Sequence, residues 1–381
     1  MAPVAEVQSQ FAAAPTPVPT KAAANIPKAN EAVANTESYP RAPLQLSGIL
    51  DKYEHFDVTP VIGREFPTVQ LKDLINAPNA DDLLRELAII ISRRGVVFFR
   101  GQDITADEQK ALTDRLGHLA GKPASSGLHI HPIYNAERDQ KYNAVDDKGT
   151  QNKDNSISVI SSNLRKSFDQ RLTNAEEWHS DITFEPVPSD YTSLKVHTLP
   201  ATGGDTLWSS GYEIYDLLSP QLRAFADTLV GRFAQPHFNA AAERGGFRVH
   251  PGPRGSPDNV GEKLEAFHPF IRTNPVTGWN SVFGLGTHFQ EIENLTTKES
   301  NLLKQYILDL VTSSHTAQVR FRWQKDDLAI WDNRSVYHAA TPDYDGLGDR
   351  AGVRAVSLGE RPYHDPNSRS RRDELGVGRL I

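Results

Sequence analysis

The sequence predicts a mainly β fold with flanking helices, in which two sheets form a double-stranded β-helix, or jelly roll. Val96–Phe99 is a short, fully apolar run of the kind that forms a buried strand. Val319, Phe321 and Trp323 alternate with polar side chains, which is typical of a half-buried strand. Candidate strands dominate the second half of the chain and helix signals surround them, so we expect the helices to pack outside the sheets.

Capping residues mark four predicted helix starts. In a capping box, a Ser or Thr and the Glu three residues later satisfy each other's backbone N–H groups. An Asn before a periodic apolar segment, or a Ser followed by Pro, marks a start as well. The four starts are Asn79, Thr105 with Glu108, Ser219 with Pro220, and Thr296 with Glu299. Gly95 is expected to end the first of these helices.

Further strands are expected at Tyr191–Leu199, Asp205–Trp208, Leu328–Trp331 and Val353–Leu358, with Gly203-Gly204 as a turn between the first two. The jelly-roll domain is predicted over residues 41–381, after an Ala/Pro-rich arm at 1–40 that is expected to be disordered. Residues 135–175 are polar and poorly patterned, which predicts a long loop and a candidate lid. The Gly/Pro/Arg-rich residues 240–263 are expected to form a surface loop.

Composition narrows the classes of protein. The 381 residues carry a net charge of −7, which disfavours nucleic acid as a partner. No apolar run reaches the roughly 18 residues that span a bilayer, so no membrane partner is expected. The chain has no cysteine, which excludes disulfides and thiolate metal sites and favours the cytoplasm as its location. Composition sets no oligomeric state, and a homo-oligomer stays open.

Trp178-His179-Ser180-Asp181 and the distant His338 supply the residues of an iron(II) site. Two His and one carboxylate can occupy one face of iron(II), which leaves the other face open for a cosubstrate and oxygen. In a strand, residues i and i+2 point to the same side, so His179 and Asp181 are expected to face the barrel interior together. For this pair alone, a buried structural histidine beside a turn-capping Asp is the commoner alternative. A second His-x-Asp, His55-Phe56-Asp57, has no further metal-like residues around it and is interpreted as a chance occurrence.

Several segments resemble the taurine dioxygenase family of iron(II)/2-oxoglutarate-dependent dioxygenases, and fungal sulfonate dioxygenases in particular. The strongest are Leu128–Tyr134, Trp178–Phe184, Leu199–Trp208 and Ala329–Arg334. The resemblance implies a jelly roll with iron(II) held by His179, Asp181 and His338. It also implies 2-oxoglutarate and oxygen as reactants, with ascorbate expected to help in vitro.

The same resemblance implies residues for the two organic molecules. They are Thr206 and Arg350 for 2-oxoglutarate, and His131, Tyr134, Phe184 and Arg354 for the substrate. A dianion needs a fixed cation, and Arg meets a carboxylate with two parallel hydrogen bonds. Since Arg354 is four positions after Arg350, both are expected on the same side of an extended strand. From the residues alone, Arg354 could instead pair with a nearby Asp, and the two aromatics could belong to the core.

The expected substrate is a small anion, most favourably an alkyl sulfonate. Hydroxylation beside sulfur gives an unstable product that breaks down to sulfite and an aldehyde, while 2-oxoglutarate becomes succinate and CO2, which indicates a role in sulfur metabolism. Taurine itself is in doubt, because Ala175 stands where the family's taurine enzymes have an Asn. Supporting roles around the site are expected for Trp331, Asp332 and Asn333, and His129 could be either a supporting or a structural residue.

Other outcomes stay open on the same scaffold, because fold does not fix function. The substrate could be a small carboxylate, an amino acid of secondary metabolism, or a sulfate ester. Asp181 disfavours the related halogenases, which lack this carboxylate, and the acidic charge disfavours a nucleic-acid demethylase. A non-catalytic jelly roll that binds an anion or a metal is the remote alternative.

Overall fold

The computed structural model describes residue 39 and residues 41–133, 155–162, 175–246 and 249–378. The chain divides into two units, Met1–Ser38 and Tyr39–Ile381, and the first lies outside the described residues. The predicted arm over 1–40, except Tyr39, and most of the predicted lid over 135–175 therefore lie outside the described residues as well.

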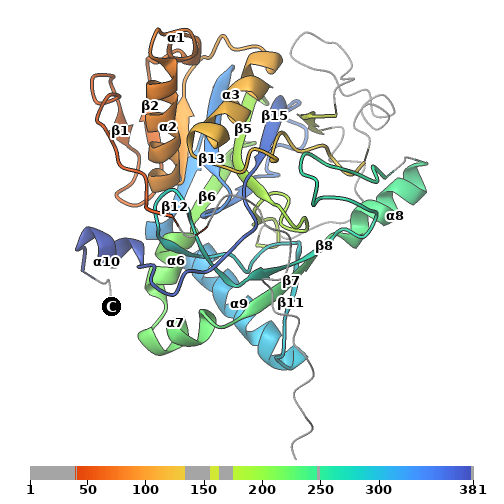
Figure 1. The fold of residues 1–381 in the computed structure, drawn as a ribbon. Helices are drawn as coiled ribbons and strands as arrows, with labels where there is room; N and C mark the ends of the chain where they lie inside the picture. The colour runs from red at the N-terminus through yellow and green to blue at the C-terminus, as the bar shows by residue number, and fades with distance from the viewer. Residues whose placement is uncertain (1–38, 40, 134–154, 163–174, 247–248, 379–381) are drawn as a thin grey trace, which may run out of the picture. The chain divides into compact units, whose positions relative to one another are not determined.

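A seven-stranded sheet forms the main frame of the second unit (Figure 1). Its neighbouring strands pair antiparallel, except that β2 and β3 run parallel. In spatial order the strands are β1 (Phe56–Asp57), β2 (Arg64–Phe66), β3 (Val96–Phe99), β13 (Asp327–Asp332), β5 (Ser189–Thr198), β15 (Ala351–Leu358) and β4 (Ile157–Ser161).

A three-stranded sheet packs against one face of this frame. It consists of β12 (Gln318–Phe321), β6 (Thr206–Ser210) and β14 (Val336–Ala340), with β6 in the middle. Because side chains alternate along a strand, β3 sends Val96 and Phe98 toward this second sheet and Val97 and Phe99 to the opposite face. The Phe98 ring stacks on Phe321 of β12 at 4.1 Å between centroids. Two facing sheets with a shared apolar core are the jelly roll that the sequence predicts.

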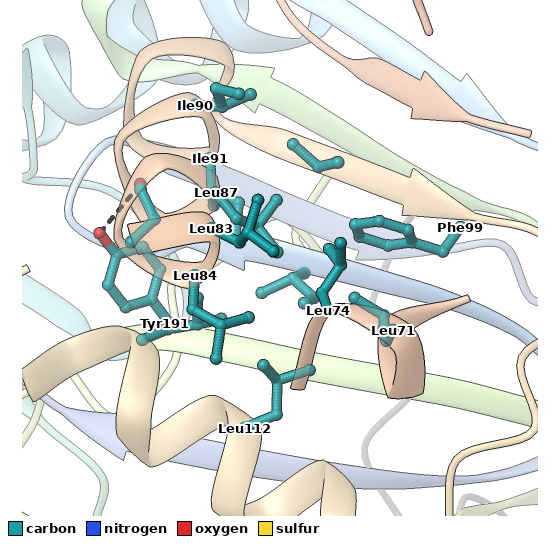
Figure 2. Packing of buried hydrophobic residues seen from close by; sticks show 14 of the residues in the cluster. Leu71, Leu74, Leu83, Leu84, Leu87, Ile90, Ile91, Phe99, Leu112 and Tyr191 are labelled. Atoms are coloured by element: carbon teal, nitrogen blue, oxygen red, sulfur yellow. Dashed lines mark hydrogen bonds between the residues drawn. The ribbon is translucent and has the colours of Figure 1, made fainter. Parts of the chain in front are cut away.

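Helices cover the other face of the large sheet. They are α1 (Leu71–Ile75), α2 (Ala80–Arg94) and α3 (Ala106–Leu119). Figure 1 shows α2 and α3 against the strands β13, β5 and β15. Figure 2 shows the apolar side chains that these helices bury, among them Leu71, Leu74, Leu83, Leu84, Leu87, Ile90, Ile91 and Leu112, together with Phe99 and Tyr191 of the sheet.

Several of the remaining elements contribute to another apolar cluster, which also includes residues of β14 in the small sheet. The helices are α6 (Gly211–Leu217), α7 (Pro220–Ala226), α8 (Pro236–Gly245), α9 (Thr297–Ser313) and α10 (Arg371–Leu375), with a short 3-10 helix at His315–Ala317. The strands are β7 (Val230–Ala234), β8 (Glu265–Pro269), β9 (Ile271–Thr273), β10 (Asn280–Val282) and β11 (Phe289–Ile292). Ile214, Phe233, Phe289 and Ile307 belong to this cluster. No helix among the described residues is both long and apolar enough to cross a membrane.

Most local predictions are confirmed. Both capping boxes form, at the starts of α3 and α9, and Ser219 caps α7. Asn79 does stand before α2, but its side chain makes no capping hydrogen bond. The predicted strands appear with ends shifted by one or two residues, and β12 ends before Trp323, whose side chain is nevertheless buried in the inter-sheet core.

Two loop predictions need correction. The described part of 135–175 contains strand β4, whose partner is β15 at the edge of the large sheet. Residues 240–263 include the end of α8, and the segment is not purely a surface loop, because Arg254 in it is buried. Its guanidinium is held by both carboxylate oxygens of Glu185, with Nη2 to Oε2 at 2.8 Å.

Candidate metal centre and its surroundings

His179 and His338 lie directly opposite each other. The backbone N–H of His338 donates to the carbonyl of His179 at 2.8 Å, and the N–H of His179 donates back at 3.1 Å. His338 is the middle residue of β14 and pairs on its other side with Trp208 of β6. The two imidazole rings consequently lie 4.3 Å apart between centroids. A single bridge between distant segments thus places both histidines side by side.

Asp181 reaches the same point from a turn. The sequence predicts one strand for His179 and Asp181, but His179 forms an isolated bridge and residues 181–184 form a turn. Ile182, immediately after Asp181, has a positive φ of 63°, which L residues seldom adopt. The predicted strand is therefore wrong, although the two side chains do converge.

The three ligand atoms are close enough to hold one ion. His179 Nε2 lies 4.0 Å from Asp181 Oδ1, and His338 Nε2 lies 3.9 Å from Asp181 Oδ2. All three atoms lie within 4.8 Å of one another, and no other such group of three is found among the described residues. Ligand atoms about 2.1 Å from a common ion lie roughly 3–4 Å apart, so small side-chain movements would complete the geometry. Two neutral nitrogens and one carboxylate on one face are the donor set that suits non-haem iron(II).

One hydrogen bond, burial and a neighbouring charge set the state of these groups. His179 Nδ1 donates to the carbonyl of Glu177 at 2.7 Å, so the lone pair of that ring is on Nε2, which faces Asp181. Burial lowers the pKa of His338 to about 3, which keeps its ring neutral. Burial alone would raise the pKa of Asp181, but the nearby positive charge of Arg354 favours the carboxylate, and the pKa is lowered. At neutral pH, His338 is therefore a neutral imidazole and Asp181 a carboxylate, the forms in which these groups bind a metal.

Asn333 supports Asp181 from behind. Its side-chain oxygen accepts the backbone N–H of Asp181 and the indole N–H of Trp331, each at 3.1 Å. Its amide nitrogen donates to Thr192 Oγ1 at 2.8 Å, and that hydroxyl donates to Asp181 Oδ2 at 3.2 Å. The Trp331 ring packs 4.9 Å from the His338 ring. Asn333 and Trp331 thus take the supporting positions expected from the sequence.

Arg350 and Thr206 are in direct contact. Arg350 Nη2 donates to Thr206 Oγ1 at 3.2 Å, and Trp323 Nε1 donates to the same oxygen at 3.0 Å. Because the Thr206 hydroxyl accepts both bonds, its own hydrogen is left to donate to a further acceptor. Arg350 Nε also donates to the carbonyl of Gly204 at 2.7 Å. Gly204 has a φ of +71°, and a Cβ there would lie 2.9 Å from Arg350 Cδ, so a side chain at this turn would displace the arginine.

Arg354 contacts the metal group rather than lying apart from it. Its Nη1 donates to Asp181 Oδ1 at 2.9 Å. From the residues alone, Arg354 could pair with a nearby Asp, and this structure contains such a pair. Arg350 lies just before β15 and Arg354 within it, with a register irregularity between Ala351 and Gly352. The continuous extended strand through both arginines, on which the expectation of a shared side rested, is therefore not present.

The other predicted substrate residues lie along a row of aromatic rings. The His131 ring lies 5.0 Å from Phe238 of α8, which lies 5.6 Å from Phe184. Phe184 meets His288 edge-on at 4.9 Å. Phe184 is also buried among aliphatic side chains, so it belongs to the core as well as to this row. Tyr134 lies outside the described residues.

His288 and Phe238 are residues that sequence reasoning missed. His288 is buried, its Nδ1 lies 3.0 Å from Thr183 Oγ1, and its ring is 6.4 Å from that of His179. Burial lowers its pKa to about 3. It stands in no recognisable motif, and it reaches the site only because residues 286–288 run against the segment that carries His179.

Two other histidines lie away from the metal group. His55 of the second His-x-Asp contacts the carbonyl of Tyr53, and its neighbour Asp57 pairs with Arg64. That pair joins no candidate metal group among the described residues, in agreement with its interpretation as a chance occurrence. His129 is buried, with Nε2 3.7 Å from Glu185, whose carboxylate is paired with Arg254. His129 thus belongs to a buried structural cluster.

Comparison with known proteins finds similarity to dioxygenases in sequence and in structure. A family model described as "Taurine catabolism dioxygenase TauD, TfdA family" matches residues 54–356. The "Alpha-ketoglutarate-dependent dioxygenase esdpJ" of Penicillium shearii is 41% identical, and the match covers 90% of this chain and 98% of the relative. A crystal structure of a taurine dioxygenase described as putative, from Burkholderia xenovorans, superposes with a TM-score of 0.62 at 25% identity, covering 83% of this chain and 92% of that one.

The likeness to sulfonate enzymes is weaker. A "Putative alpha-ketoglutarate-dependent sulfonate dioxygenase" of Schizosaccharomyces pombe is 32% identical over 84% of this chain and 74% of its own. The fungal kinship expected from the sequence is confirmed. The relative with the higher identity, however, carries no sulfonate in its name, so the comparisons leave the substrate to be argued from the site.

Proposed function

Because the chain belongs to the TauD, TfdA family and is thus an iron(II)/2-oxoglutarate-dependent dioxygenase, we propose that it hydroxylates a small organic anion, with an alkyl sulfonate favoured. The observation that carries this proposal is a pair of separately held arginines, one bonded to the metal group and the other bonded to Thr206 on the strand that pairs with the strand of His338. Arg350 contacts Thr206, and Arg354 contacts Asp181. Two fixed cations provide for two anions, the cosubstrate and the substrate.

His179, Asp181 and His338 would hold iron(II), as their donor types and spacing support. When bound, iron(II) with 2-oxoglutarate supplies oxygen activation, in which the cosubstrate becomes succinate and CO2 and the substrate gains a hydroxyl group. The chain's own task is to bind and orient both molecules and to exclude competing reactions.

Arg350 and Thr206 would bind the far carboxylate of 2-oxoglutarate. Thr206 pairs with Ala340 and Trp208 pairs with His338, so Thr206 lies two residues along the sheet from a metal ligand. Two residues along a strand span about 7 Å, which suits a five-carbon diacid with its keto-acid end at the metal. The Thr206 hydroxyl, with both acceptor positions used, donates to that carboxylate, and the guanidinium supplies the charge.

Arg354 would bind the substrate anion, with His131 and the aromatic row around the remaining atoms. In this structure Arg354 is bound to Asp181, so an incoming anion shares or takes over a guanidinium that already has a carboxylate partner. A sulfonate keeps its charge at every physiological pH and offers three oxygens to such a clamp. Hydroxylation at the carbon next to sulfur then leads to sulfite and an aldehyde.

The Arg354 clamp also suits a small carboxylate, an amino acid or a sulfate ester, and these remain the alternative substrates. Ala175 is half-buried in a turn shortly before His179 and has no polar side chain to offer an amine, which speaks against taurine. The non-catalytic binding protein considered from the sequence is set aside, because membership of an enzyme family overturns it.

A panel of sulfonates, sulfate esters, carboxylates and amino acids tests this proposal, with iron(II), ascorbate and 2-oxoglutarate present and succinate and sulfite measured in parallel. Sulfite in equal amount to substrate-dependent succinate is the expected result. If a carboxylate or an amino acid raises succinate formation and no sulfonate does, the substrate belongs to that other class. If no member of the panel raises succinate formation above its background rate, the proposed substrate class is wrong.

A further inference from the structure

His288 occupies a position beside the metal group that the proposed function does not explain. It directly precedes β11, and Gly286, two residues before it, lies against the backbone of His179. Gly286 allows this approach, because it has a φ of +101° and a Cβ there would lie 2.9 Å from His179 Cα. His288 is therefore brought next to a metal ligand by a specific feature of the backbone.

The orientation of the His288 ring is fixed from two sides. Thr183 Oγ1 is 3.0 Å from Nδ1, and the Phe184 ring meets the imidazole edge-on at 89° and 4.9 Å. The Thr183–Phe184 turn is itself held, since His268 Nε2 donates toward the carbonyl of Thr183 at 2.9 Å. Only 7% of His288 is exposed, so the ring has little room for other orientations.

Within the described residues, the only hydrogen bond of the ring is the one between Nδ1 and Thr183. Nε2 thus lacks a protein partner there, and it is not among the fully enclosed polar atoms of the described residues, so it borders space that a ligand can reach. His288 is also not one of the three residues that form the metal group. A polar atom held in place beside a reaction centre without a partner is what a ligand-binding position requires.

We propose that His288 is a specificity-determining residue whose Nε2 forms a hydrogen bond with a hydroxyl or carbonyl oxygen of the substrate, near the carbon that is oxidised. This inference rests on the proposed function and narrows its substrate class. Arg354 adjoins Asp181, and His288 adjoins His179. A small anion that Arg354 binds beside the metal is therefore expected to meet His288 as well. The preferred substrate is then a functionalised anion rather than a plain alkyl one.

Matched probe pairs that differ by one hydroxyl group test the proposal. They are ethanesulfonate with 2-hydroxyethanesulfonate, and butanoate with 3-hydroxybutanoate. Dissociation constants are measured by calorimetry without oxygen, on the full chain loaded with iron(II) and 2-oxoglutarate. The variants are His288→Phe, which keeps a ring against Phe184, and His288→Gln, which keeps a hydrogen-bonding group near the position of Nε2. His315→Phe, at an exposed histidine in the short 3-10 helix, is the matched control.

The wild type should bind the hydroxylated member of at least one pair about tenfold more tightly, because a plain anion would cover Nε2 without giving it a hydrogen bond. His288→Phe should abolish this preference, His288→Gln should keep part of it, and the control should keep all of it. If His288→Phe keeps the preference for the hydroxylated probe, the assignment is wrong. If His288→Phe weakens the binding of both probes of a pair equally, His288 has a purely structural role, and the assignment is also wrong. Failure of the proposed function has a different result. In that case the wild type binds neither probe of any pair, and the assignment of His288 is wrong as well.

Discussion

The side-chain oxygen of Asn333 accepts the backbone N–H of Asp181 at 3.1 Å, which ties the carboxylate of the metal group to the end of strand β13. The amide nitrogen of Asn333 also donates to Thr192, whose hydroxyl donates to Asp181 Oδ2. Asp181 lies in a turn and not in a strand, so these bonds supply the rigidity that a sheet would otherwise give it. The position of Asp181 therefore depends on a residue outside the group of three metal ligands.

Asn333→Ala should lower iron affinity by about ten- to a hundredfold, the range typical for residues that orient metal ligands. The reason is that both the backbone and the carboxylate of Asp181 lose support. Anaerobic iron(II) titration measures the effect, with Asn301→Ala on the exposed face of α9 as the control. Unchanged affinity in Asn333→Ala would mean that Asp181 is positioned by other contacts.

Thr206→Val should raise the KM for 2-oxoglutarate about tenfold and leave the KM for the substrate nearly unchanged. Valine keeps the volume but loses the hydroxyl that accepts from Arg350 and Trp323 and donates to the cosubstrate. Steady-state kinetics with each reactant varied in turn provide the measurement. A larger effect on the substrate would place the cosubstrate elsewhere.

Arg354→Ala should raise the KM for the anionic substrate about a hundredfold and change that for 2-oxoglutarate far less, since it removes a charged hydrogen-bonding partner. Arg361→Ala, at an exposed arginine, is the matched control. Equal changes in both constants would show that Arg354 acts through Asp181 Oδ1, its partner in this structure, and not on the substrate.

Gly286→Ala should destabilise the fold and weaken iron binding together. The new Cβ would meet His179 Cα at 2.9 Å, in addition to the strain of a positive φ. Gly346→Ala is a control that separates these effects, because Gly346 also has a positive φ but a Cβ added there would meet no atom within 4 Å. The control should cost about 1 kcal/mol of unfolding free energy and leave iron affinity intact. Equal melting temperatures and equal iron affinities for the two variants would show that the contact with His179 is easily relieved.

Sequence reasoning succeeded where the signal is local. The capping boxes at Thr105 and Thr296 form because both partners lie within one helical turn. The alternation of Val319 and Phe321 predicts a half-buried strand because period and burial are properties of the strand itself. The three metal ligands were found through a motif and a family resemblance, and the structure brings them together even though the strand predicted for two of them is wrong.

Sequence reasoning missed features that depend on distant partners. Strand β4 is polar in part and becomes a strand because β15 pairs with it. Arg254 reads as a surface residue in a Gly/Pro-rich stretch, yet Glu185 compensates its charge in the interior. His288 has no motif, and its role follows only from Gly286 and Thr183 around it.

The most direct test of the central claim is an anaerobic iron(II) titration, with 2-oxoglutarate present, of the wild type, His179→Ala and His55→Ala. His55 belongs to the other His-x-Asp of the chain and provides a control of the same chemistry. The wild type and His55→Ala should bind one ion per chain and form succinate when oxygen is admitted, and His179→Ala should do neither. Iron binding and succinate formation that persist in His179→Ala would contradict the assignment of His179, Asp181 and His338 as the metal centre.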